Sequence, residues 1–97
     1  MYRIGTSRVG QNPTRWTEAA SLEDAVRLVS IAIGNLALET ENACRRGRCG
    51  ACRACQAALA IYRSFGPKCR VLTHAELKTA GQSVWRFDGH EVWAVEA

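Results

Sequence analysis

The chain has 97 residues, of which 47% are hydrophobic and 23% are charged, as in an ordinary soluble globular protein. We expect one domain, residues 1–97, with a modest core that a bound metal would help to stabilise. No segment approaches the roughly 20 apolar residues that span a bilayer, and the N-terminus lacks the apolar run of a signal peptide. The composition therefore predicts a cytoplasmic protein without membrane contact.

The formal net charge is +4, and the charges are unevenly distributed along the chain. Five acidic residues and one arginine lie between Thr17 and Glu41, whereas no acidic residue lies between Asn42 and Ala75. Seven basic residues occupy this second segment: Arg45, Arg46, Arg48, Arg53, Arg63, Lys68 and Arg70. Such a segment favours a negatively charged partner, either nucleic acid or an acidic protein surface.

The first predicted elements are two short strands and a long helix. Alternation over residues 2–7 predicts a strand, and residues 15–18 can return beside it after a turn. Ser21 can cap the helix that follows, and Asp24 occupies the position from which a capping-box side chain reaches back. Apolar residues then recur every three or four positions, which predicts a central helix: Leu22, Ala25, Val29, Ala32 and Leu36.

Two further helices are predicted in the middle of the chain. The first runs from about residue 50 or 51 to Ser64, because its apolar residues share one face. Gly66 followed by Pro67 predicts where it ends. Thr73 and Glu76 have the spacing of a capping box, so we expect a third helix of about two turns after Thr73.

The C-terminal segment, residues 83–95, predicts a β-hairpin. Asp88 and Gly89 form the dipeptide that favours a two-residue type I′ turn, and the resulting register places Arg86 opposite Glu91. Both faces of the hairpin carry apolar side chains, so we expect one to pack on helices and the other to be partly covered. The expected fold is α+β: a helical hairpin clipped by a four-cysteine metal site and packed on a small antiparallel sheet.

Four of the five cysteines lie within twelve residues, in the segment CRRGRCGACRAC: Cys44, Cys49, Cys52 and Cys55. Thiolates at such spacings can bind one metal ion, and an odd number of cysteines fits a disulfide framework poorly. Cys52 and Cys55 would be neighbours at a helix start, with Cys44 and Cys49 in the loop before it. We therefore predict a zinc site with these four ligands, in which Cys69 can replace Cys44 or Cys55.

The same segment resembles the cluster loop of plant-type two-iron ferredoxins. The resemblance rests on the nine residues CRRGRCGAC, with C-x4-C-x2-C spacing and glycines at Gly47 and Gly50. It implies an iron–sulfur cluster with an electron-transfer or redox-sensing role. That family takes its fourth cysteine roughly thirty residues later, and residues 81–86 contain none. CGACRAC also has the C-x2-C-x2-C spacing of four-iron sites, which Cys44 or Cys69 would complete.

Four arginines flank the cysteines: Arg45, Arg46, Arg48 and Arg53. Four thiolates subtract four charges and a zinc ion adds two, which would lower the net charge from +4 to +2, and the arginines can neutralise this centre. Alternatively they contact phosphates. We expect a small zinc-binding protein that acts as a binding or regulatory module, contacting nucleic acid or an acidic protein surface through this loop.

One other function remains as an alternative: a protein-interaction module with a purely structural zinc ion, whose contact surface is the hairpin that carries Trp85 and Trp93. We do not expect an enzyme, because His74 and His90 stand alone and there is no glycine-rich phosphate loop or nucleophile motif. We therefore expect no catalytic residues.

Overall fold

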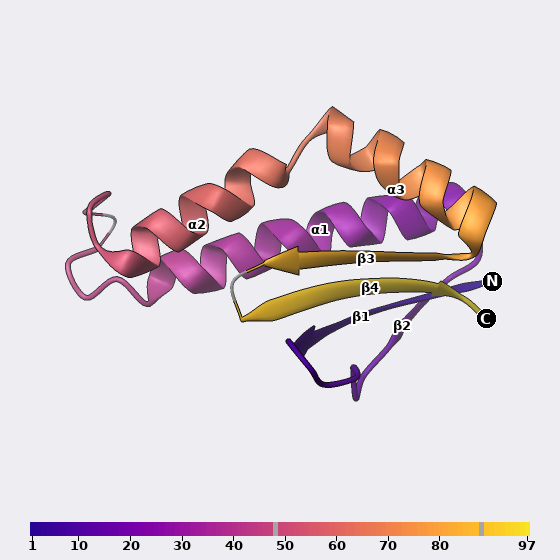
Figure 1. Ribbon diagram of the computed structural model, residues 1–97, viewed down its shortest axis with the longest axis horizontal. Helices are drawn as coiled ribbons and strands as arrows, with labels where there is room; N and C mark the ends of the chain where they lie inside the picture. The colour runs from indigo at the N-terminus through magenta and orange to yellow at the C-terminus, as the bar shows by residue number, and fades with distance from the viewer. Residues whose placement is uncertain (48, 88) are drawn as a thin grey trace.

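The computed structural model describes residues 1–47, 49–87 and 89–97. Arg48 and Asp88 lie outside the described residues, and so do the predictions made for them. The elements in chain order are β1 (Tyr2–Arg8), β2 (Thr17–Ala19), α1 (Leu22–Asn42), α2 (Arg53–Ser64), α3 (Pro67–Ala80), β3 (Gln82–Phe87) and β4 (His90–Glu96). This arrangement of helices and strands confirms the predicted α+β fold (Figure 1).

The four strands form one antiparallel sheet in the order β2-β1-β4-β3. The C-terminal hairpin has the predicted register, with Arg86 opposite Glu91, and these two side chains form an ion pair of 2.9 Å. β1 pairs with β4 along its whole length, from Tyr2 opposite Glu96 onward. The two ends of the chain therefore lie side by side at the centre of the sheet.

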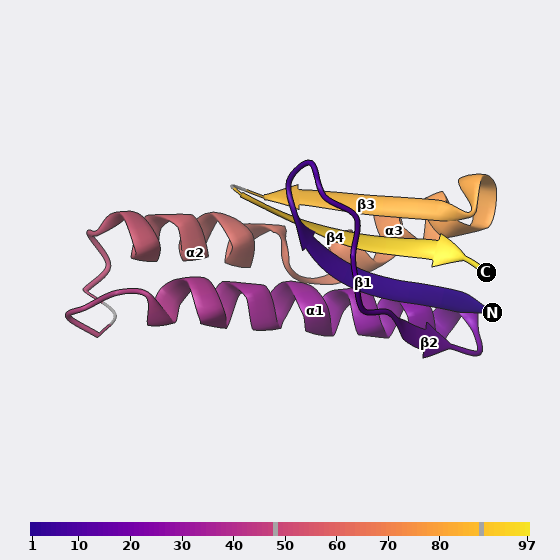
Figure 2. The ribbon, with the colours of Figure 1, turned by 90° about the horizontal axis from the view of Figure 1, so that it is seen from below.

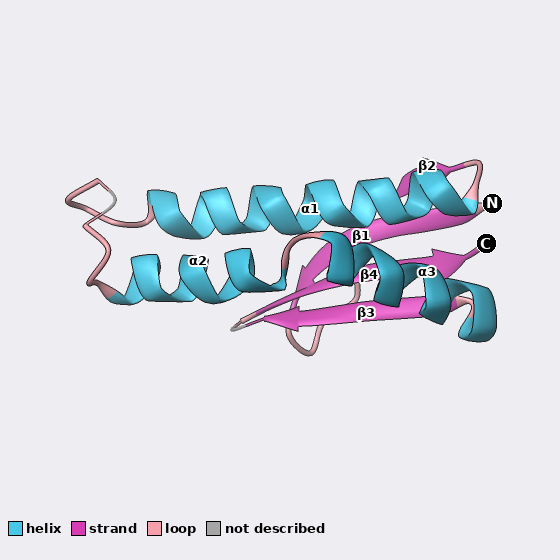
Figure 3. Cartoon of the chain, turned by 90° about the horizontal axis from the view of Figure 1, so that it is seen from above, coloured by secondary structure: helices cyan, strands magenta, loops and turns pink. Residues whose placement is uncertain are grey.

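The three helices form a layer over one face of the sheet (Figure 3). The core lies between the two layers, where Val29 and Ile33 of α1 are completely buried together with Val92 of β4. Leu77 of α3 is 1% exposed in the same cluster. α2 and the C-terminal part of α1 continue past the end of the sheet as a helical hairpin, whose connecting loop lies at one end of the molecule (Figure 1).

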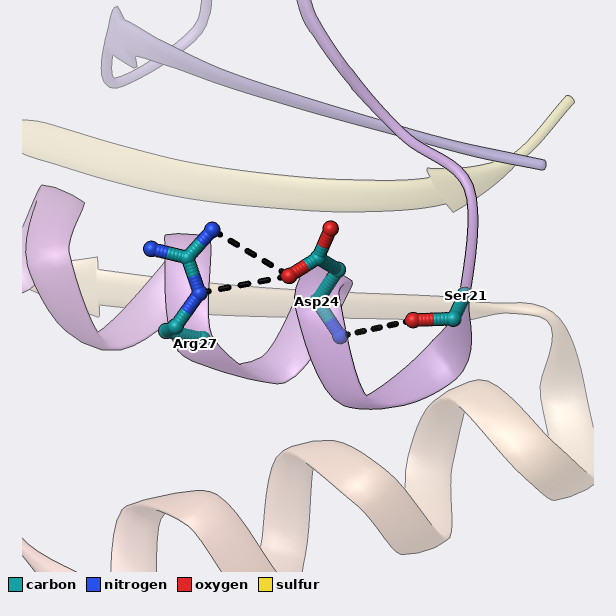
Figure 4. A network of polar contacts seen from close by, with 3 residues as sticks. All are labelled: Ser21, Asp24 and Arg27. Atoms are coloured by element: carbon teal, nitrogen blue, oxygen red, sulfur yellow. Dashed lines mark hydrogen bonds and ion pairs between the residues drawn. The ribbon is translucent and has the colours of Figure 1, made fainter.

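The start of α1 agrees only in part with the capping box that the sequence predicts. Ser21 is the N-cap, and its hydroxyl oxygen accepts a hydrogen bond of 3.1 Å from the backbone amide of Asp24, as predicted (Figure 4). The carboxylate of Asp24 does not reach back to complete a capping box. It accepts two hydrogen bonds of 3.2 and 3.1 Å from Arg27, because a guanidinium group one turn away offers charged donors.

The third helix is longer than predicted. α3 begins at Pro67 and not after Thr73, because proline is well suited to the first position of a helix as well as to the end of the preceding one. Thr73 lies in the middle of α3 and is completely buried. Its hydroxyl oxygen accepts a hydrogen bond of 2.9 Å from the indole nitrogen of Trp85 in β3. The predicted capping box at Thr73 is therefore wrong.

The face of the sheet away from the helices is partly covered by the segment between β1 and β2, which arches across it (Figure 2). A Cβ atom on Gly5 would lie 2.7 Å from Cβ of Pro13 and 3.1 Å from Cε3 of Trp16, so this close approach requires glycine. On the same face Trp93 donates a hydrogen bond of 3.2 Å to Ser7. Trp85 and Trp93 are therefore half-buried within the fold, and a contact surface built on them stays a prediction.

Candidate metal centre

The structure brings the four predicted cysteines together at the tip of the helical hairpin. Cys44 follows the end of α1, Cys49 lies in the loop, Cys52 is the N-cap of α2, and Cys55 lies in its first turn. Their Sγ atoms all lie within 4.8 Å of one another. One detail differs from the sequence prediction: α2 begins at Arg53, so Cys52 caps the helix and does not lie inside it.

Local hydrogen bonds shape the loop around the sulfur atoms. Sγ of Cys49 accepts a hydrogen bond of 3.3 Å from the backbone amide of Cys52, and Sγ of Cys52 accepts one of 3.4 Å from the amide of Cys55. Gly50 has a φ of 78°, which lets the chain reverse direction, and its carbonyl oxygen accepts a 2.6 Å hydrogen bond from the side chain of Gln56. The loop thus directs backbone donors at the sulfurs.

The distances between the sulfur atoms match the coordination shell of a single ion. Sγ of Cys49 lies 3.6 Å from Sγ of Cys44 and 3.9 Å from Sγ of Cys55. A tetrahedral site with metal–sulfur bonds of about 2.3 Å requires sulfur–sulfur distances of about 3.8 Å. The four-cysteine cluster is therefore compatible with metal binding.

Backbone amides of the loop lower the pKa of two of the cysteines and so favour their thiolate forms. Backbone amides of Cys49 and Arg46 lower the pKa of Cys44 to about 6, despite the burial of its sulfur. Amides of Ala51 and Cys52 lower the pKa of Cys49. A thiolate is the form that binds a metal, so the backbone around both cysteines favours a cation, and Cys44 is a thiolate at neutral pH.

The pKa of Cys55 is shifted in the opposite direction. The backbone amide of Gly50 favours its thiolate, but burial and the hydrogen bonds with Cys44, Cys52 and Cys49 outweigh that amide and raise the pKa of Cys55 to about 12. Several sulfurs packed together cannot all be negative without a cation between them. Cys55 is therefore the cysteine that keeps its proton in the metal-free cluster.

Cys69 does not belong to the cluster. It lies in α3, is 2% exposed, and packs in the hydrophobic core, where its Sγ lies 3.9 Å from the hydroxyl oxygen of Thr73. Burial raises its pKa and outweighs the hydrogen bond with Thr73 and the charge of Arg70, which both favour the thiolate. The prediction that Cys69 can replace Cys44 or Cys55 is therefore wrong, because the core of the fold holds it elsewhere.

Three of the four predicted arginines are described, and all three lie beside the cysteines. Arg45, Arg46 and Arg53 are exposed, and together with cysteine and alanine side chains they line a hollow of about 630 Å³. Among the residues that the structure describes, no carboxylate pairs with any of these three guanidinium groups. Their positive charge is thus directed at solvent next to the cysteine cluster.

No protein-family model, no curated protein and no solved structure matches this chain. Within the described ranges, none of the helices is long and apolar enough to cross a membrane. What can be said about function therefore rests on the cysteine cluster and its surroundings.

Proposed function

We propose that the four cysteines bind one zinc ion, which ties the end of α1 to the start of α2. The sulfur–sulfur distances of 3.6 and 3.9 Å support this, since they bracket the value that a tetrahedral zinc–thiolate site requires. All four positions are filled by protein ligands, which is typical of a structural zinc site and not of a catalytic one. We therefore propose that the protein is a binding module without enzymatic activity.

The alternative is an iron–sulfur cluster held by the same cysteines. In a cluster of two or four irons the cysteine sulfurs are divided among different irons, and those on different irons lie farther apart than the ligands of one ion. Here all four sulfurs lie within 4.8 Å, which favours one ion over a cluster. This single observation carries the proposal of one ion, and a closed set of four thiolates makes zinc the ion that we propose.

Elemental analysis tests the proposal. We expect protein purified anaerobically without added metal to be colourless and to contain one equivalent of zinc. Replacing Cys49 by serine should abolish the bound zinc, because Cys49 contacts two other sulfurs. Cys69→Ala is the matched control and should retain one equivalent. A brown protein that contains iron and acid-labile sulfide would contradict the zinc site.

We further propose that the zinc-fixed loop binds phosphate groups of nucleic acid through Arg45, Arg46 and Arg53. Two features support phosphate as the partner. The guanidinium groups have no carboxylate partner among the described residues, and the first turn of α2 contains no acidic residue that would repel a phosphate beside them. Arginine also matches the geometry of phosphate oxygens better than lysine does.

The salt dependence of DNA binding tests this second proposal. Each phosphate contact contributes about 0.9 to the slope of log K against log salt for duplex DNA, so Arg45→Ala with Arg46→Ala should lower the slope by about 1.8. The matched control replaces Arg3 and Arg15, two exposed arginines that lie outside the helical hairpin, and should leave the contacts at the loop intact. Equal losses in both double variants would show that only net charge matters and would rule out the loop as the contact.

A further inference from the structure

One edge of the sheet is open along its whole length. β3 is the last strand in the order β2-β1-β4-β3, and within the part of the chain that the structure describes it pairs only with β4. The amide of Glu96 donates to the carbonyl oxygen of Gly81 at 2.8 Å, which fixes the alternation of hydrogen bonds along the hairpin. The backbone groups of Gln82, Val84 and Arg86 therefore point away from β4. They form a row of donors and acceptors without a partner strand.

A groove runs along this open edge. Its volume is about 500 Å³, and its lining consists of Gln82, Val84 and Arg86 from β3 with Glu76 and Ala80 from α3. These three strand residues are the ones whose backbone groups point outward. Figure 3 shows β3 at the outer edge of the sheet alongside α3. The groove thus has a hydrogen-bonding strand as one wall and a helix as the other.

The helix wall adds side-chain chemistry to the groove. Glu76 and Ala80 lie one turn apart on the same side of α3, and Leu72 lies one turn before them, with 43% of its surface exposed. Among the described residues Glu76 has no ion-pair partner. A strand beside β3 would turn alternate side chains toward this wall, where Glu76 favours a basic one and Leu72 an apolar one.

We propose that this groove binds an extended segment of a partner protein, which adds a fifth strand to the sheet beside β3. Backbone hydrogen bonds to Gln82, Val84 and Arg86 give the affinity, and a lysine or arginine of the segment facing Glu76 gives the specificity. On the other face of the new strand, Arg86, whose side chain is 74% exposed, favours an acidic neighbour.

A second copy of this chain fits the edge less well. A two-fold axis at Val84 would pair the two β3 strands and place the α3 helices of both copies next to each other on one face of the joined sheet. The wall that contains Glu76 would then face the same wall of the second copy, and two carboxylates would meet across the axis. A partner segment with a basic residue avoids this repulsion.

Random peptides displayed on phage provide the probe. We expect selection on the zinc-loaded protein to yield peptides with a basic residue in an alternating pattern. The variant Val84→Pro removes an outward backbone N–H without breaking a hydrogen bond to β4. It should lower the affinity for the selected synthetic peptide about tenfold or more. Val84→Ala keeps the amide and is the matched control, so it should bind nearly as well as the wild type.

A second variant tests the proposal even when Val84→Pro does not fold. Glu76→Lys changes an exposed helix position and should make the selection favour an acidic residue in place of the basic one. The proposal is overturned if no peptide is selected, if both variants bind the peptide as tightly as the wild type, or if sedimentation shows that β3 instead joins two copies of the chain and that Val84→Pro separates them.

Discussion

Burial and local hydrogen bonds give the cysteines of the cluster different proton affinities. Cys44, with a pKa of about 6, is a thiolate at neutral pH, whereas Cys55, with a pKa of about 12, keeps its proton there. A bound zinc ion requires both as thiolates, so binding displaces the proton of Cys55 throughout the neutral range. Below pH 6 it displaces the proton of Cys44 as well.

The pH dependence of zinc affinity follows from these two pKa values. Because the pKa of Cys44 is lowered, its thiolate is present above pH 6 and is lost as the pH falls through about 6. We therefore expect the slope of log affinity against pH to steepen by about one proton below that pH. Competition titrations against a chelator of known affinity between pH 5 and 8 measure the slope. A slope that stays constant over this range would contradict the assigned protonation states.

Thr73 shows how a polar side chain in the core stabilises the contact between a helix and the sheet. Replacing it by valine keeps the shape but removes the acceptor for the indole N–H of Trp85, which costs about 1 to 3 kcal/mol of unfolding free energy. Urea titration measures the loss. Thr79→Val is the matched control, since Thr79 is exposed on the same helix, and should change stability by less than about 0.5 kcal/mol. Equal effects of both changes would mean that helix propensity, and not the buried hydrogen bond, sets the cost.

The elements that the sequence predicted well are those defined by short-range signals. The register of the hairpin follows from the pattern around Gly89, and the start of α1 follows from the hydroxyl of Ser21. The cysteine cluster belongs with them, because four ligands within twelve residues need only one loop to bring them together. Most of the candidate metal centre could therefore be predicted, and the differences are the role of Cys52 as a cap and the place of Cys69 in the core.

The features that the sequence did not predict depend on contacts between distant segments. The pairing of β1 with β4 joins the two ends of the chain, and no local pattern in either strand specifies the other. The first half of α3 was missed because Gly66 and Pro67 end one helix and begin the next within two residues. Thr73 has the spacing of a helix cap, but tertiary packing with Trp85 decides its position.

Removal of zinc should unfold only one part of the helical layer. The cluster joins α1 to α2 beyond the end of the sheet, whereas the core around Ile33 and Val92 lies between the helices and the sheet. We expect a strong chelator to abolish the hydrogen-exchange protection of amides in residues 49–56 and to preserve that of β4. Hydrogen exchange read by NMR distinguishes these segments. Simultaneous loss of protection in α2 and β4 would show instead that the whole fold depends on the ion.

The shape of the whole molecule separates the two proposed binding surfaces. Its extents are 42 × 27 × 18 Å, and the arginine-lined hollow lies at the tip of the helical hairpin, at one end of the long axis (Figure 1). The groove beside β3 lies along α3, toward the other end. Nucleic acid at the loop and an extended segment at the sheet edge can therefore be bound at the same time. Such a protein would connect two partners.

Because the two proposed surfaces are separate, mutations in them should have additive effects on the free energies of binding. Arg45→Ala should weaken DNA binding and leave peptide binding unchanged, Val84→Pro should do the reverse, and the double variant should show both losses without an added interaction. Sites that share no contacts usually combine within about 0.3 to 0.5 kcal/mol. Titrations of each ligand in the absence and presence of the other, with the four proteins of this cycle, measure the coupling. A change of tenfold in peptide affinity on DNA binding would show instead that the two surfaces are coupled, and the hollow that Arg53 of α2 and Arg86 of β3 both line is the place where they approach each other.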